Sequence, residues 1–219
     1  RNGRLRAAAT PMLSWLRRFR SARPSTPLEL QLVELDQEAA AAPESQRGAL
    51  FNRAGDLCAA EGLVRRALVY YGRAVDAYLE AGYLGPAAAM CRKILRHSPE
   101  AVRAHCTLAC LAAHGQHVRE VKAEIRHLVE ASRRTRTERL TIARLRLLAD
   151  AVEDREVKQY IAAQLHGLGD VLGSARITDA LAAERPQRRD TLGHAGDEAR
   201  WDKLVLAAAL DPDELWKYA

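Results

Sequence analysis

Small residues recur among large ones at helical spacing in the first half of the chain. The pattern consists of Gly55, Gly62, Ala67, Tyr71 and Ala74. Glycine and alanine let two helix axes approach closely, because little side chain stands between the backbones where the helices cross. A large residue on the facing helix then fills the space that remains. The pattern therefore predicts antiparallel helix pairs that pack side by side.

The composition supports a helical fold. Hydrophobic residues make up 48% of the 219 residues, whereas aromatic residues make up only 5%. The apolar content consists mainly of alanine and leucine, which favour helices, whereas β-branched and aromatic residues favour strands. We therefore expect an all-α protein, an antiparallel helix-pair solenoid with N- and C-terminal extensions. Its predicted parts are a basic tail with a short amphipathic helix (1–25), the solenoid (26–184), and a polar loop with C-terminal helices (185–219).

Caps, glycines and prolines predict where several helices begin and end. Thr26-Pro27-Leu28-Glu29 has the form of a capping box, so a helix is expected from about Pro27 to Ala40. Further helices are expected at about 63–81, 85–97 and 100–114, where glycine or proline interrupts the apolar periodicity.

Three groups of large and small residues in the central part match one known repeat pattern. The first group is Phe51, Ala54, Gly55, Ala67, Tyr71 and Ala74, and the second is Tyr71, Tyr78, Gly82, Leu84, Ala87, Ile94, Leu95 and Pro99. The third runs from Pro99 through Leu108, Ala109 and Ala112 to Val121, Ile125 and Leu128. On these residues the chain resembles the tetratricopeptide repeat family, most strongly over about residues 48–132. The phase is irregular, since the first two groups both use the helix around Tyr71.

The resemblance implies a concave surface that binds another protein, formed by the first helix of each pair. The residues that it implies for this groove are Asn52, Asp56 and Ala59 in the first repeat and Arg103, Cys106, Cys110 and His114 in the third. The implied function is a non-catalytic scaffold or adaptor, an accessory subunit of a larger protein complex. A structural subunit that is permanently buried in a complex stays open as an alternative.

The positive charge is concentrated at the N-terminus. Of the 34 Lys and Arg residues, seven arginines precede the first acidic residue, Glu29, which leaves 27 basic residues against 28 acidic ones. The body of the chain is therefore not expected to coat nucleic acid. A nucleic-acid-associated regulator would use the Arg-rich middle, at Arg133, Arg134, Arg136, Arg139, Arg144 and Arg146. Acidic residues are interspersed there, so a solvated surface with ion pairs is favoured over a nucleic-acid site.

A short amphipathic segment lies within the basic tail. Its apolar residues are Met12, Trp15, Leu16 and Phe19, and its basic residues are Arg17, Arg18 and Arg20. An isolated helix of this length is marginally stable in water, so its apolar face needs a surface. Three surfaces stay open: an anionic membrane with the arginines at the headgroups, a groove on a larger protein complex, or the chain's own solenoid.

Aromatic residues also lie in the C-terminal extension, at Trp201, Trp216 and Tyr218. Large aromatic side chains often contribute most of the energy of binding, so these three are expected to anchor a C-terminal interface. The alternative is that they cover the apolar end of the solenoid.

The sequence contains no recognised catalytic motif, so we expect neither an enzyme nor a metal or other cofactor. Cys106, Cys110 and His114 recur at about one helical turn, but ligands spaced along one helix cannot converge on a single tetrahedral ion. Gly167-Leu168-Gly169 follows an amphipathic helix and lacks the lysine of a phosphate-binding loop, so it is expected to be an interhelical turn.

Cysteine spacing and hydropathy indicate the cellular compartment in which the protein is expected. No two cysteines have the Cys-x-x-Cys spacing, and no window has the roughly 20 apolar residues of a membrane span. We therefore expect a cytoplasmic protein, peripheral to a membrane if the N-terminal segment binds lipid. The Ala- and Arg-rich composition resembles that of a protein from a GC-rich bacterial genome.

Overall fold

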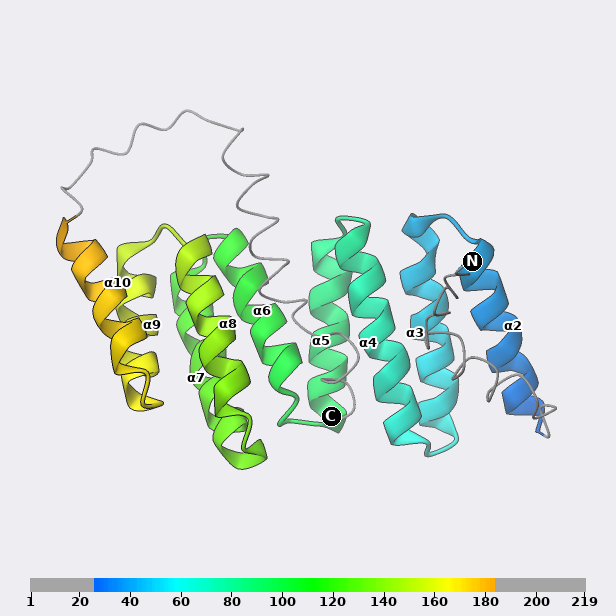
Figure 1. The fold of residues 1–219 in the computed structure, drawn as a ribbon. Helices are drawn as coiled ribbons and strands as arrows, with labels where there is room; N and C mark the ends of the chain where they lie inside the picture. Colours follow the sequence, from blue (N-terminus) through cyan, green and yellow to red (C-terminus); the bar gives the residue numbers. More distant parts are fainter. Residues whose placement is uncertain (1–25, 184–219) are drawn as a thin grey trace, which may run out of the picture.

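The computed structural model describes residues 26–183, and every regular element in this range is an α-helix (Figure 1). The helices are α2 (Pro27–Ala41), α3 (Glu44–Ala60), α4 (Val64–Glu80), α5 (Leu84–His97), α6 (Val102–His114), α7 (Val118–Thr135), α8 (Glu138–Ala151), α9 (Arg155–Gly167) and α10 (Val171–Ala183). The prediction of an all-α fold is confirmed.

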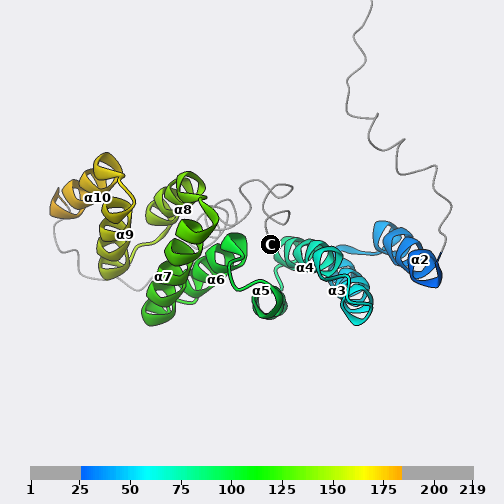
Figure 2. The ribbon, with the colours of Figure 1, turned by 90° about the horizontal axis from the view of Figure 1, so that it is seen from below.

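Consecutive helices pack against each other in an elongated array with α2 at one end and α10 at the other (Figure 1). Seen from below, α3, α5, α7 and α9 form one row, and α4, α6, α8 and α10 form the other (Figure 2). The array is bowed, and the row that contains α4, α6 and α8 lies on the inner side of the bend. Some helices within one row also contact each other, namely α7 with α9 and α6 with α8. The arrangement is that of a solenoid-like helical stack.

The local signals that the sequence carries are found at the helix ends. Thr26 Oγ1 accepts a hydrogen bond from Glu29 N, and Glu29 Oε2 accepts one from Thr26 N, both at 3.2 Å, so the capping box is formed. Gly62 and Gly82, which follow α3 and α4, have φ angles of 72° and 74° that favour glycine. The expected turn at Gly167-Leu168-Gly169 is present between α9 and α10.

Close contact between α3 and α4 depends on two glycines. A Cβ atom on Gly55 would lie 2.4 Å from the ring of Tyr71, and one on Gly48 would lie 2.6 Å from the ring of Tyr78. Both distances are far below van der Waals contact, so only glycine allows the two helices to approach as they do. The predicted packing of small against large residues is therefore present at this helix pair.

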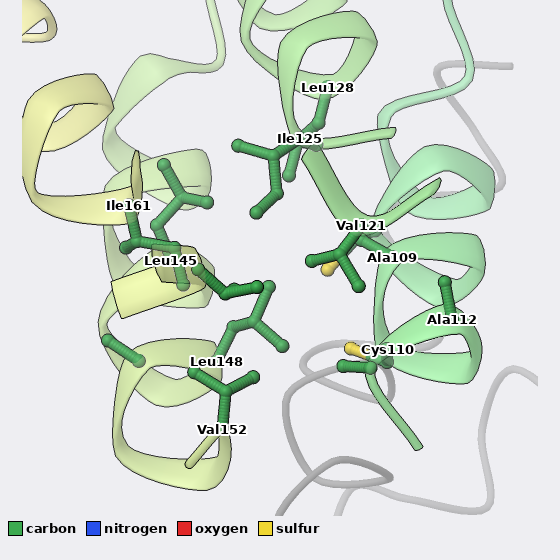
Figure 3. Packing of buried hydrophobic residues seen from close by; sticks show 14 of the residues in the cluster. Ala109, Cys110, Ala112, Val121, Ile125, Leu128, Leu145, Leu148, Val152 and Ile161 are labelled. Carbon is green, nitrogen blue, oxygen red and sulfur yellow. The ribbon is translucent and has the colours of Figure 1, made fainter. Parts of the chain in front are cut away.

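The interior consists of two apolar clusters that meet at α6. Ala101, Ala104 and Leu108 belong to the cluster that extends toward α2. The other cluster extends toward α9, and Figure 3 shows it with Ala109 and Cys110 of α6 near Val121, Leu145 and Leu148. Because α6 supplies side chains to both clusters, it is the most thoroughly buried helix among those that the structure describes.

Asp170 attaches α10 to the rest of the stack. Its carboxylate accepts hydrogen bonds from Arg146 Nε and Nη2 at 2.7 and 2.6 Å, and from the backbone N of Gly173 at 3.1 Å. The hydrogen bond from Arg146 is the main cause that lowers the pKa of Asp170 below its usual value. The ionised carboxylate therefore both caps α10 and links it to α8.

Replacing Asp170 with asparagine is expected to lower stability at neutral pH and to remove one source of acid sensitivity. A carboxyl group whose pKa is lower in the folded state stabilises the fold above its unfolded pKa of about 3.9, and this stabilisation is lost as pH falls through the lower folded pKa. Urea unfolding midpoints of the two proteins should therefore differ at pH 7 and converge at the most acidic pH. A difference that is constant from pH 7 to below pH 3 would contradict this role of the charge.

Candidate partner-binding surface

The structure places the two groups of predicted groove residues in different rows of the stack. Asn52 and Asp56 lie on α3, where Asn52 Oδ1 accepts a hydrogen bond from Lys93 Nζ at 2.9 Å. Asp56 pairs with the same lysine and accepts a hydrogen bond from the hydroxyl of Tyr71 at 2.7 Å. These contacts join α3, α4 and α5, and α3 and α5 belong to the outer row (Figure 2).

The other predicted groove residues lie on α6, in the inner row. Arg103, Cys106 and Cys110 are buried, and His114 is partly buried at the end of the helix. Arg103 forms an ion pair with Asp76 of α4. Burial lowers the pKa of the Arg103 guanidinium, and the nearby carboxylate of Asp76 raises it. The structure thus does not bring these residues together with Asn52 and Asp56 in one groove, and their role in partner binding stays a prediction.

The cysteines of the described region are buried and free of disulfides. Burial raises the pKa of the Cys91 thiol to about 12. Cys106 and Cys110 share a hydrogen bond that lowers the pKa of Cys106 and raises that of Cys110, and the nearby Arg144 also favours a Cys106 thiolate. Their burial keeps these thiols from dissolved reagents, so the side chains serve mainly to fill the interior.

Ion pairs link α2, α4 and α6. Asp36 of α2 pairs with Arg73 of α4 at 2.7 Å and accepts a hydrogen bond from the Tyr70 hydroxyl at 2.9 Å. Burial, followed by the negative charge of Asp36, raises the pKa of Tyr70 to about 12, so this hydroxyl remains a donor. One turn farther along α4, Asp76 reaches α6 through Arg103. Charged contacts therefore run from α2 through α4 to α6.

Two exposed valines lie about one helical turn from the residues of the pair between Asp36 and Arg73. Val33 and Val69 are each 43% exposed. Val33 precedes Asp36 by three residues and Val69 precedes Arg73 by four, so each valine shares a helix face with its charged neighbour. We call the surface made by Val33, Asp36, Val69 and Arg73 the α2–α4 face. Sequence reasoning missed it, although Val33 lies outside the buried stripe of Leu32, Leu35 and Ala39 on the same helix.

Several arginines of the Arg-rich middle contact groups within the protein. Arg133 donates a hydrogen bond to the Gly167 carbonyl at 3.2 Å, and Arg134 pairs with Glu100 at 3.6 Å. Arg144 is buried, and Arg146 binds Asp170. These contacts agree with a surface that carries ion pairs.

The remaining predicted site residues lie outside the described residues. They are the N-terminal anchor residues Met12, Trp15, Leu16, Arg17, Arg18, Phe19 and Arg20, and the C-terminal interface residues Trp201, Trp216 and Tyr218. Within residues 26–183, none of the helices has the length and hydropathy needed to cross a bilayer.

Comparison with known proteins gives no match, whether with family models, with curated proteins or with solved structures. The likeness to tetratricopeptide repeats therefore rests on the residue pattern and on the helical stack alone.

Proposed function

We propose that this protein is a non-catalytic scaffold or adaptor for protein–protein interactions, an accessory subunit of a larger complex. Its elongated stack offers long side faces to other polypeptides (Figure 1). The observation that carries the proposal is the α2–α4 face, where each residue of a formed ion pair has an exposed valine about one helical turn away. The proposal includes a cytoplasmic location and attachment through the basic N-terminal segment, which directly precedes α2 in the chain.

The chemistry of the α2–α4 face suits an amphipathic segment of a partner protein. A single exposed valine is ordinary on a protein surface, but here both valines lie about one helical turn from the two partners of one ion pair. A partner helix could cover Val33 and Val69 with apolar side chains while its polar groups meet Asp36 and Arg73. Because Arg73 already lies 4.0 Å from the Phe51 ring centroid and pairs with Asp36, its position is held before a partner binds.

The partner-binding role is tested with a Val33→Asp and Val69→Asp double variant of the full chain. Both side chains are well exposed, so the fold should be retained while two added carboxylates oppose burial of the positions by an apolar partner. We expect each specific partner captured from cells of the source organism to decrease at least about tenfold, as judged by quantitative mass spectrometry.

Leu172→Asp is the matched control, because Leu172 is 84% exposed on α10 at the far end of the stack. This control should capture the same partners as the unchanged chain. Equal capture by the double variant would contradict a role for the α2–α4 face, and circular dichroism of all three proteins would show that they are folded.

A further inference from the structure

Three side chains with metal-ligand chemistry converge between α6 and α7. His105 lies on α6, whereas Glu124 and His127 lie on α7 with the three-residue spacing that places both on one helix face. Glu124 Oε2 lies 2.9 Å from His105 Nδ1 and 4.0 Å from His127 Nδ1. One ligand atom from each residue lies within 4.8 Å of the other two. The three groups could therefore reach one ion.

The hydrogen bonds of His105 favour a cation at this point. His105 Nε2 lies 3.0 Å from the carbonyl oxygen of Pro99. A carbonyl can only accept, so Nε2 carries the hydrogen and a neutral ring has its lone pair on Nδ1. That lone pair faces the Glu124 carboxylate at 2.9 Å, and two acceptor atoms at this distance need a hydrogen or a metal ion between them.

The hydrogen bond from His105 Nε2 to the Pro99 carbonyl is of the kind that usually orients a metal-binding histidine. Histidines that bind metals commonly donate their other ring N–H to a carbonyl or a carboxylate, which fixes the tautomer and the ring orientation. His105 is 7% exposed, so its ring is already held in place by its surroundings. The Nδ1 atom of this ring is thus oriented toward Glu124 of the neighbouring helix.

The separations suit a small tetrahedral ion after a modest side-chain movement. Zinc bonds of about 2.0–2.1 Å to nitrogen and oxygen place neighbouring ligand atoms about 3.3 Å apart. The two observed separations to Glu124, 2.9 and 4.0 Å, lie on either side of this value, and the separation between the ligand atoms of the two histidines is at most 4.8 Å. The side chain of His127 is 46% exposed and can turn toward Glu124. The same exposure leaves an open side from which water could complete the coordination.

We propose that His105 Nδ1, Glu124 Oε2 and His127 Nδ1 bind one Zn²⁺ ion, with water as the fourth ligand, and so join α6 to α7. Two imidazoles and one carboxylate are ligands that zinc commonly takes when a coordination position stays open. The inference is independent of the proposed function, because none of the three residues belongs to the α2–α4 face.

Zinc binding is tested on the purified full chain, freed of any histidine tag and treated with a chelator. Calorimetric titration with Zn²⁺ should show one ion per chain, and Co²⁺ should give the visible absorption of a tetrahedral site. His127→Ala should weaken Zn²⁺ binding by at least about tenfold, since it removes one of three protein ligands. Zn²⁺ should raise the melting temperature of the unchanged chain by mass action and have much less effect on this variant.

His166→Ala is the matched control, because His166 is an exposed histidine on α9. It should bind Zn²⁺ as the unchanged chain does. The proposal is overturned if the unchanged chain binds no Zn²⁺, or if His127→Ala binds it as tightly as the control. The second result would assign the binding to other groups of the chain.

Discussion

Replacing Asp76 with alanine is expected to destabilise the fold by about 3 kcal/mol, because it removes the carboxylate that pairs with the buried Arg103 guanidinium. Arg103 is only 1% exposed, so water replaces the lost interaction poorly. Asp76 retains some contact with solvent, which places the expected cost at the lower end of the range for buried pairs. Urea unfolding followed by circular dichroism would measure the change.

An Asp76→Ala and Arg103→Met double variant separates the charge from the packing. Methionine keeps much of the length of the arginine side chain but carries no charge, so the double variant should be more stable than Asp76→Ala alone. If Asp76→Ala costs less than about 1 kcal/mol, or if the second substitution only adds to the loss, the ion pair is not the reason for the effect.

Replacing Gly55 with alanine should destabilise the protein by about 2 kcal/mol, although alanine is the better helix former. Alanine at an unconstrained helical position would gain up to about 1 kcal/mol over glycine. Here the added Cβ would lie 2.4 Å from the Tyr71 ring. That ring is buried, its hydroxyl donates to Asp56, and Lys93 lies 4.6 Å from its centroid, so it has little freedom to move. The cost of overpacking should therefore exceed the gain in helix propensity.

Gly85→Ala is the control for this prediction. Gly85 lies within α5, and a Cβ atom there would have no neighbour within 4 Å. The variant should be as stable as the unchanged protein or slightly more stable in thermal unfolding. If both alanine variants gain stability, the spacing of α3 and α4 does not depend on the absence of a side chain at position 55.

Helix ends could be predicted from capping residues and glycines close to them in the sequence. The capping box at Thr26 and Glu29 predicted the start of α2 correctly, and the predicted end at Ala40 differs by one residue from the observed end at Ala41. The helix expected at about 100–114 begins at Val102, because Ala101 still forms a turn with Ser98. Glycines and caps act through backbone conformation and nearby hydrogen bonds, so they can be recognised without knowing what packs nearby.

The arrangement of the predicted partner-binding residues could not be predicted from such local signals. The repeat pattern placed Asn52 and Arg103 in one groove, but a pattern that uses the helix around Tyr71 twice does not determine which helices share a row. In the structure α3 and α6 belong to different rows (Figure 2). The pattern also did not predict that Arg103 and Arg144 are buried, because a charged residue is ordinarily exposed unless a partner distant in the sequence compensates its charge.

The cluster of His105, Glu124 and His127 could likewise not be predicted from the sequence around each residue. The local signal was the three-residue spacing of Glu124 and His127 on α7, which is common on helix surfaces and carries little information alone. His105 comes from the preceding helix, and only the packing of α6 against α7 brings its ring beside Glu124.

The sequence by itself determined the helical class of the described region, the ends of several of its helices, and the packing of Gly55 with Tyr71 between α3 and α4. Each of these depends on backbone propensity or on a small residue at a short spacing. Only the tertiary structure decided which charges are buried, which valines are exposed and which histidines meet. Those properties arise between helices, where a rotation of one helix by a single residue, about 100°, changes the face that meets its neighbour.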